Sequence, residues 1–209
     1  SSYGTLCVKP AKSNGSRGFR VIKPLDTVHS FFYEKPSSRN ITYENLCEVL
    51  SESRNSFPDL LLMEYMPGEE FSVDCVKFDS KFYCVTRRRD IIKDGICSTG
   101  TAIKKPELIE ICRELYESLN LSHNVNIQFR YDSSGNPKLL EINPRVAGSM
   151  ELCRGAGINF IQLSLEEAMG ISKTVNQTVR WGTKMTRVWE EIFCHEDDLF
   201  LLESIKEII

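Results

Sequence analysis

The sequence predicts an α+β fold in which helices pack against mostly antiparallel sheets. Val125–Tyr131 alternates apolar and polar side chains, as a strand with one buried face does. The segment that begins at Lys105 and Pro106 instead repeats apolar residues every three or four positions, as an amphipathic helix does. Strands follow one another across short turns, and helices stand between the strand pairs, which is the element order of an α+β fold.

The first third of the chain is expected to contain strands and one amphipathic helix. Thr5–Lys9 and Phe19–Ile22 are predicted strands, and the polar loop Ala11–Gly18 joins them. Thr42 opens the helix, because a threonine just before the first turn can accept a hydrogen bond from a free backbone N–H. Leu60–Met63 is a continuous apolar run, which predicts a buried strand.

The rest of the chain is predicted to add strand pairs and helices. Phe71–Phe78 and Phe82–Arg88 alternate around a tight turn at Asp79 and Ser80, which is typical of a hairpin. The remaining predictions are a glycine- and serine-containing loop over Gly95–Thr101, a helix over Phe160–Met169 and an apolar-rich helix over Leu199–Ile209.

Composition argues against several classes of function. The formal net charge of the 209 residues is −3, which gives no electrostatic basis for binding nucleic acid or an anionic membrane. No apolar run approaches the roughly 20 residues that a membrane-spanning helix needs. The eight cysteines are widely spread without a CxxC pair, so we expect buried free thiols and a cytoplasmic protein.

A predicted hairpin carries the strongest sign of chemistry. The turn Asp132–Pro137 joins two strands, and pairing Tyr131 with Lys138 would place Gln128 directly opposite Glu141. Asn143 shares a face with Glu141, because alternate residues of a strand point the same way. Side-chain oxygens gathered in this way suit Mg²⁺, although a plain surface hairpin with polar residues facing water would share the pattern.

The segment VNIQFRYDSSGNPKLLEINPRVAGSM closely resembles the closing motif of the ATP-grasp superfamily. The similarity is greatest to the branch with the carbamoyl-phosphate synthetase large subunits and amino-acid ligases. The resemblance implies two α+β lobes whose mostly antiparallel sheets sandwich ATP. It also implies that Gln128, Glu141 and Asn143 ligate Mg²⁺, which Mn²⁺ could replace, and that Arg145 binds a phosphate.

The loop after the first strand resembles the ATP-grasp loop that lies over the phosphates. Glycines let backbone N–H groups approach phosphate oxygens closely, although a Gly/Ser loop alone could be a simple surface turn. The resemblance implies phosphate contacts from Lys9 and from the loop residues Ser13, Gly15, Ser16 and Gly18.

The segment LLLMEYMPG resembles the linker between the two ATP-grasp lobes. By resemblance, the carbonyl of Glu64 and the N–H of Met66 contact adenine, Tyr65 lies between them, and Glu70 reaches the ribose. Met63 departs from the pattern, because many family members carry an acidic residue there. The methionine can still pack on the base.

Three consecutive arginines are predicted to lie on a strand. Arg87 and Arg89 share one face and Arg88 the other, and such a run is usually a solvated edge. Because ATP-grasp proteins carry basic residues toward the transferred phosphate at a comparable place, the resemblance implies this role for Arg87 and Arg89. It also leads us to expect the Gly95–Thr101 loop near the acceptor substrate.

The resemblance implies a division into an N-terminal lobe over residues 1–64 and a C-terminal lobe over residues 65–209. The first lobe is partial and holds the phosphate loop 9–18, and the second holds the metal-binding hairpin 125–145 and C-terminal helices. Full-length relatives also have an N-terminal Rossmann-like domain, so we expect a fragment, which could bind ATP without turnover.

The implied activity is that of an ATP-dependent carboxylate–amine ligase. A small-molecule carboxylate would be activated as an acyl phosphate and then attacked by an amine or ammonia. Two alternatives stay open, namely a non-catalytic module that binds nucleotide or dimerises and a small-molecule kinase. A homodimer is compatible with an apolar C-terminal segment, and neither nucleic acid nor a membrane is an expected partner.

Overall fold

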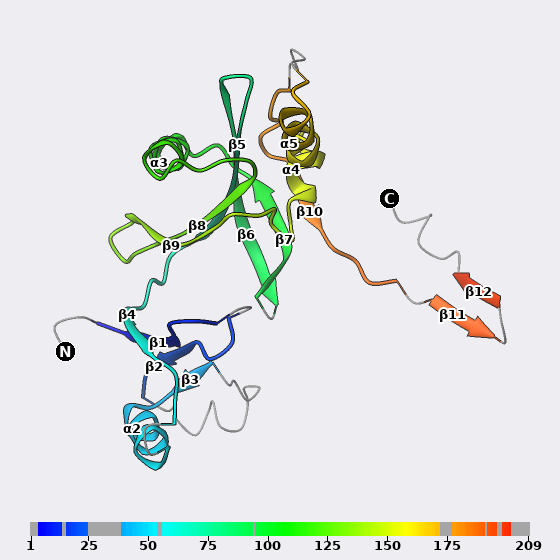
Figure 1. The fold of residues 1–209 in the computed structure, drawn as a ribbon. Coiled ribbons are helices and arrows are strands. Elements are labelled where there is room, and N and C mark those ends of the chain that lie inside the picture. Colours follow the sequence, from blue (N-terminus) through cyan, green and yellow to red (C-terminus); the bar gives the residue numbers. More distant parts are fainter. Residues whose placement is uncertain are drawn as a thin grey trace.

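The computed structural model contains two sheets that follow one another along the chain (Figure 1). The first has four strands in the order β3-β2-β1-β4, antiparallel except for β2 and β3. Its elements are β1 (Leu6–Pro10), β2 (Arg20–Ile22), β3 (Asn40–Ile41), the helix α2 (Tyr43–Glu52) and β4 (Leu60–Glu64). The described residues are 4–13, 16–24, 39–53, 56–93, 95–171, 177–190, 192–195 and 198–201.

The second sheet has six antiparallel strands in the order β10-β7-β6-β5-β8-β9. A separate hairpin of β11 (Ile192–His195) and β12 (Asp198–Leu201) lies away from both sheets in Figure 1. The remaining elements are β5 (Glu70–Phe78), β6 (Lys81–Lys93), β7 (Ile96–Ala102), α3 (Pro106–Ser118), β8 (Val125–Tyr131), β9 (Pro137–Asn143), α4 (Glu151–Gly155), α5 (Phe160–Ala168) and β10 (Lys184–Thr186).

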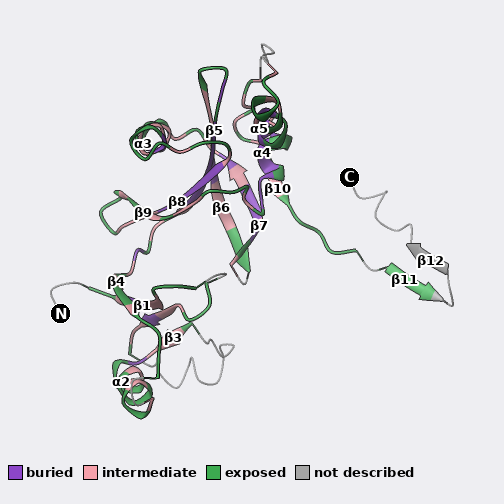
Figure 2. Ribbon diagram, viewed as in Figure 1, coloured by how far each residue is buried: buried purple, intermediate pink, exposed green. Residues whose placement is uncertain are grey.

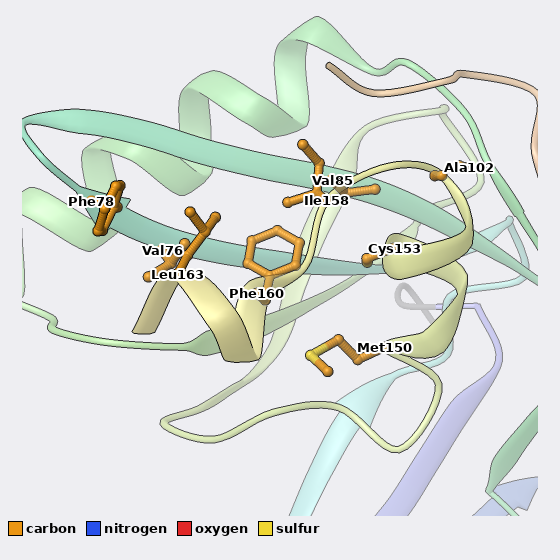
Figure 3. Packing of buried hydrophobic residues seen from close by; sticks show 10 residues of the cluster. Val76, Phe78, Val85, Ala102, Met150, Cys153, Ile158, Phe160 and Leu163 are labelled. Atoms are coloured by element: carbon orange, nitrogen blue, oxygen red, sulfur yellow. The ribbon is translucent and has the colours of Figure 1, made fainter. Parts of the chain in front are cut away.

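The central part of the six-stranded sheet, mainly β5 and its neighbours β6 and β8, is buried on both faces, because helices cover each side there (Figure 2). On one face, Leu108 and Cys112 of α3 pack against odd-numbered residues of β5 such as Val73. On the other face, the segment of α4 and α5 packs against Val76 and Val85 (Figure 3). The second cluster comprises Val76, Phe78, Val85, Ala102, Met150, Cys153, Ala156, Ile158, Phe160 and Leu163.

Several local predictions are confirmed. Thr42 accepts a hydrogen bond from the backbone N–H of Asn45 at 3.1 Å and so caps α2. Pro106 stands in the first turn of α3, where its missing N–H costs nothing. The β5–β6 turn holds Asp79 and Ser80 at φ of 46° and 63°, the left-handed backbone that a two-residue hairpin turn requires. The α+β class with mostly antiparallel sheets is therefore confirmed.

Three predictions about individual segments are wrong. Leu60–Met63 lies in a strand, but Leu61 and Leu62 are 43% and 64% exposed, because β4 is the edge of a thinly covered sheet. The Gly95–Thr101 segment is mostly the strand β7, whose backbone pairs with both β6 and β10. Within the predicted C-terminal helix, residues up to Leu201 belong to β12, and residues 202–209 lie outside the described part.

The cysteines are free thiols, as the sequence predicts. Five are buried, Cys84 is partly exposed, and Cys47 and Cys194 are exposed. In the described part of the chain, none of the helices combines the length and apolar character needed to cross a bilayer. The predicted lobe boundary between residues 64 and 65 falls between the last strand of the first sheet and the first strand of the second, and we keep it as a proposal.

Candidate nucleotide site

A cavity of about 450 Å³ lies where the two sheets face each other, a size ordinary for a small-molecule site. Six lysine and arginine side chains line it against three glutamates, so its charge favours an anion. The predicted site residues in its lining are Lys9, Ser13, Ser16, Met63, Glu64, Tyr65, Met66, Glu70, Arg89, Gln128, Glu141 and Arg145.

The predicted metal ligands meet at the junction of β8 and β9. The amide nitrogens of Gln128 and Asn143 each donate to Glu141 Oε1 at 2.8 Å. Gln128 and Glu141 are partners across the two strands, and both line the cavity. Asn143 is outside the lining but touches Glu141, so the three side chains form one cluster of oxygen-bearing groups.

A β-bulge sets this register. Tyr131 pairs with Pro137 rather than with Lys138, which shifts the turn by one residue from the predicted pairing. Between the partners of Phe129 and Gln128, β9 has one extra residue, which cancels the one-residue shift of the turn. Gln128 therefore still pairs with Glu141. The predicted partnership is thus correct although the predicted turn pairing is wrong. The bulge lies at Leu140, which lines the cavity.

Three charged residues from adjacent strands form a row beside this cluster. Glu70 of β5 forms ion pairs with Arg89 of β6 and, at 3.6 Å, with Arg130 of β8. Arg89 also donates to Gln128 Oε1 at 3.2 Å and to the Gly95 carbonyl at 2.6 Å. Arg89 is therefore held at the cavity wall, in contact with a predicted metal ligand.

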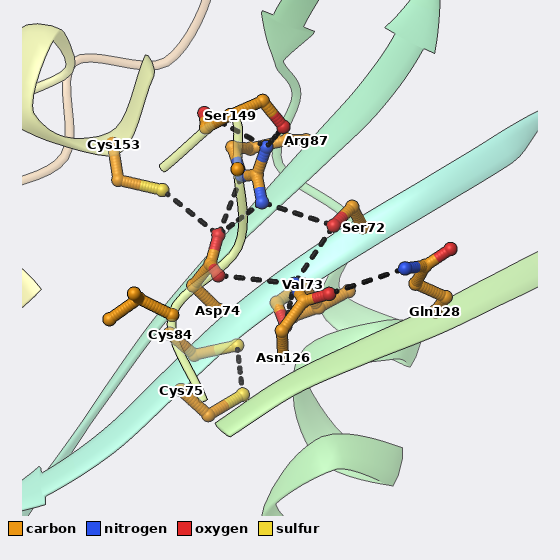
Figure 4. A network of polar contacts seen from close by, with 12 residues as sticks. Ser72, Val73, Asp74, Cys75, Cys84, Arg87, Asn126, Gln128, Ser149 and Cys153 are labelled. Atoms are coloured by element: carbon orange, nitrogen blue, oxygen red, sulfur yellow. Dashed lines mark hydrogen bonds and ion pairs between the residues drawn. The ribbon is translucent and has the colours of Figure 1, made fainter. Parts of the chain in front are cut away.

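Arg87 is not at the cavity. Its side chain is 1% exposed and donates from Nε to Asp74 Oδ2 at 2.6 Å and from Nη1 to Ser149 Oγ at 2.6 Å (Figure 4). It shares a sheet face with Arg89, as predicted, but the chain segment at Ser149 and Cys153 covers it. Burial disfavours its charge, yet the Asp74 carboxylate outweighs burial and raises the pKa of Arg87.

The Arg87 network reaches the metal-ligand cluster through one buried amide. Asn126, fully buried, donates to Ser72 Oγ at 2.8 Å and to Asp74 Oδ1 at 3.1 Å. Its own oxygen accepts from Gln128 Nε2 at 3.4 Å (Figure 4). Hydrogen bonds therefore connect Arg87 in the interior to Gln128 at the cavity. Arg87 belongs to this buried network and does not itself line the cavity.

The predicted adenine-binding linker presents backbone groups at an open sheet edge. Tyr65 donates its N–H to the Thr5 carbonyl at 2.9 Å, so these two residues form a hydrogen-bonded pair. In an antiparallel ladder such pairs alternate with pairs that exchange no backbone hydrogen bonds, and Glu64 with its β1 partner is a pair of the second kind. The N–H and carbonyl of Glu64 consequently take no part in the backbone ladder with β1, although the carbonyl accepts from Cys7 Sγ at 3.7 Å. Among the described residues β4 is the edge of its sheet, so no further strand pairs with Glu64, which lines the cavity.

The phosphate loop is only partly described. Lys9, Ser13 and Ser16 line the cavity, whereas Gly15 lies outside the described residues. Gly18 does not line the cavity but has a φ of +76°, and a Cβ there would lie 2.7 Å from the ring of Pro10. Gly18 therefore closes the base of the loop and is required for its shape.

Some cavity residues were missed in the sequence. Arg130 is the clearest, since the alternation of β8 puts it on the same face as Gln128, and this signal could have identified it. Cys7 could have been identified in the same way, because it lies two residues before Lys9 on one strand. The others come from loops, from strand ends or from the bulge. They are Pro10, Ala11, Arg17, Phe19, Arg39, Gly95 and Leu140.

This fold and the oxygen-donor hairpin define the ATP-grasp class of proteins. The family described as "ATP-grasp in the biosynthetic pathway with Ter operon" matches residues 56–191, and the chain belongs to this family. Among curated proteins, carnosine synthase 1 of Gallus gallus is 31% identical over 99 residues, which are 43% of this chain and 10% of that protein.

Solved structures agree on the fold. The biotin carboxylase domain of Hydrogenobacter thermophilus 2-oxoglutarate carboxylase, in complex with MgADP, ADP and bicarbonate, matches with a TM-score of 0.62 at 16% identity. That match covers 88% of this chain and 41% of that one. An ADP complex of N5-carboxyaminoimidazole ribonucleotide synthetase matches with a TM-score of 0.61 at 14% identity, over 88% of this chain and 45% of that one. The chain thus spans less than half the length of these relatives.

Proposed function

We propose that the chain is the ATP- and Mg²⁺-binding part of a ligase that activates a small-molecule carboxylate as an acyl phosphate for attack by an amine or ammonia. The single observation that carries the proposal is one contact cluster at the cavity, in which Glu141 accepts hydrogen bonds from Gln128 and Asn143 and Gln128 accepts one from Arg89. The curated relative is named a synthase, and the solved relatives carry MgADP or ADP, which supports the same chemistry.

The donor set fits a hard divalent cation. Glu141 offers a carboxylate, and Gln128 and Asn143 offer amide oxygens once each amide turns its oxygen toward the carboxylate. When bound, Mg²⁺ supplies positive charge that offsets charge on the transferring phosphoryl group. Mn²⁺, which takes the same oxygen ligands, could replace it.

Five basic or loop groups would bind the triphosphate. Lys9 supplies a point charge from the first sheet, and Arg89 and Arg145 supply guanidinium groups from the second. Ser13 and Ser16 add hydroxyl groups from the loop. Because these groups come from opposite walls of the cavity, the nucleotide would lie between the two sheets.

The adenine would lie at the edge of β4. The backbone of Glu64 offers an acceptor, Met66 offers an N–H, and the side chains of Met63 and Tyr65 offer packing surface. Glu70 would have to exchange part of its pairing with Arg89 and Arg130 to bind ribose hydroxyls. We therefore expect these two arginines to reorient when nucleotide binds.

The proposed reaction has two steps, and the atoms balance in each. A substrate carboxylate oxygen attacks the γ-phosphorus of ATP, which forms the acyl phosphate and releases ADP. The amine nitrogen then attacks the acyl carbon, inorganic phosphate leaves, and the amine proton passes to solvent or phosphate. Arg89 and Arg145 would stabilise the charge on the phosphoryl oxygens during the first step.

A hydroxylamine trap tests the acyl phosphate. The full-length protein that contains this chain is incubated with MgATP, hydroxylamine and a panel of carboxylates, and hydroxamate and ADP are measured together. Equal yields of hydroxamate and ADP support the ligase. Transfer of the γ-phosphate to an acceptor without hydroxamate identifies a kinase, and MgATP binding by calorimetry without ADP release identifies a non-catalytic nucleotide module.

A matched variant pair controls the test. Glu141→Gln removes the carboxylate charge at nearly constant size, and Glu107→Gln removes an exposed carboxylate on α3, away from the cavity lining. We expect only Glu141→Gln to slow hydroxamate formation strongly and weaken MgATP binding. Equal effects of both variants would contradict the site assignment.

A further inference from the structure

Three cysteine thiols meet on the sheet face opposite the candidate nucleotide site. Cys75 of β5, Cys84 of β6 and Cys112 of α3 have their sulfur atoms within 4.8 Å of one another. Cys75 and Cys84 are direct cross-strand partners, and their sulfurs are 3.6 Å apart. The three ligands come from three different elements, so only the packing of α3 on the sheet brings them together.

The sulfur spacing matches a metal site better than a disulfide. A disulfide joins two sulfurs at about 2.0 Å and has no use for a third. A metal at about 2.3 Å from each of three sulfurs in a plane would hold the sulfurs roughly 4.0 Å apart. The Cys75 and Cys84 sulfurs are 3.6 Å apart, and all three sulfurs lie within 4.8 Å of one another, so small side-chain shifts would bring them to that separation.

The surroundings of the three thiols are apolar and already packed. Cys75 and Cys112 are fully buried among residues such as Val73, Leu108 and Ile127, and Cys84 is partly exposed. Within the part of the chain that the structure describes, no fourth histidine, cysteine or carboxylate joins the group at this spacing. A cation could therefore enter past Cys84 and would find three sulfur ligands.

We propose that Cys75, Cys84 and Cys112 form a second metal site, which binds one soft cation of the Cu(I) type in three-coordinate geometry. Soft thiolate ligands select soft ions, whereas Mg²⁺ requires oxygen. Zn²⁺ also takes thiolates, but protein sites that hold it structurally provide four ligands. Three sulfurs without a fourth ligand thus favour Cu(I). This site is separate from the proposed nucleotide site and does not depend on it.

The test uses Cu(I) itself on the protein with the exposed thiols removed. The reduced protein carrying Cys47→Ser and Cys194→Ser is titrated anaerobically with Cu(I) against a coloured Cu(I) chelator. We expect one Cu(I) per chain, and we expect Cys84→Ala to weaken binding by more than about tenfold, as loss of a ligand contact does. Cd²⁺ serves as a second probe, because its thiolate complexes absorb in the ultraviolet.

Two controls keep the outcome decisive. Cys97→Ala removes another buried thiol that lies outside the group, and it should leave Cu(I) binding unchanged. Cys84→Ala alters the least buried member of the group, so its fold can be checked by unfolding in urea. Absence of a one-to-one complex, or equal loss in Cys97→Ala and Cys84→Ala, would overturn the proposal.

Discussion

The two sheets differ in how much core stands behind them. The six-stranded sheet is covered on both faces, and Phe71, Val73, Val76 and Val85 are fully buried in it. Among the described residues, the four-stranded sheet buries few side chains, and its edge strand exposes apolar residues (Figure 2). Regions with few buried apolar contacts open at lower free energy, so we expect the first sheet to be the more mobile partner.

The proposed functions are divided between the two sheets in line with this difference in packing. The oxygen donors and Arg89 stand on the well-packed sheet, which can hold charged groups at fixed separations. Lys9 and the phosphate loop stand on the thin sheet, which can adjust to the nucleotide. The unequal cores would by themselves make the six-stranded sheet the rigid support of the reacting groups and the four-stranded sheet the more flexible side of the nucleotide site.

The largest expected effect is the loss of stability that Arg87→Met causes in the six-stranded sheet. It leaves Asp74 buried without its cation, and breaking a buried ion pair in this way costs about 3–5 kcal/mol. Urea unfolding should show a loss of that size. Arg88→Met is the matched control, because the partly exposed Arg88 pairs with Glu69 and Asp90 near the surface, where a pair contributes roughly 0–1 kcal/mol. Similar losses of unfolding free energy in Arg87→Met and Arg88→Met would contradict the expected difference between a buried and an exposed ion pair.

The next largest effect concerns chemistry on the same sheet. Glu141→Gln should lower the rate of hydroxamate formation by about 10²–10³, the loss typical when a group that stabilises transition-state charge is removed. Because Glu141 is exposed, its unfolding free energy should stay close to that of the unmodified protein. A variant that lost stability but kept its rate would reverse the roles assigned to Arg87 and Glu141.

Gly18→Ala tests the more flexible side of the nucleotide site. Alanine at φ +76° is strained, and its Cβ would approach the Pro10 ring to 2.7 Å, so a local cost of about 1–3 kcal/mol is expected. We expect weaker MgATP binding in calorimetry, because the phosphate loop must shift. Gly135→Ala has a similar φ of +80° with nothing within 4 Å, and it should leave MgATP binding unchanged.

The smallest effect concerns the hairpin turn. Asp132 accepts backbone hydrogen bonds from Asn136 at 2.8 Å and Ser134 at 2.9 Å, and these lower its pKa below 3.8. A lowered folded-state pKa contributes stability above pH of about 3.8, and this contribution is lost as the pH falls through the folded-state pKa. The protection factors of the turn amides, which correct for the intrinsic slowing of amide exchange in acid, should therefore fall as the pH is lowered, and Asp132→Asn should abolish that pH dependence.

Much of the fold could be predicted because its signals are local. The alternation of Val125–Tyr131, the cap at Thr42 and the proline at Pro106 each act within a few residues, and the structure confirms all three. The partnership of Gln128 with Glu141 was also predicted, but the turn pairs Tyr131 with Pro137, and only the bulge at Leu140 brings the two side chains back into the predicted register.

Only the tertiary structure decided which of two equivalent residues reaches the cavity. Arg87 and Arg89 share a strand face, yet the segment at Ser149 buries Arg87 and leaves Arg89 at the cavity. The exposure of Leu62 and the meeting of Cys112 with two strand cysteines were equally hidden. Periodicity states which way a side chain points along its own element, but burial depends on which distant segment packs over it.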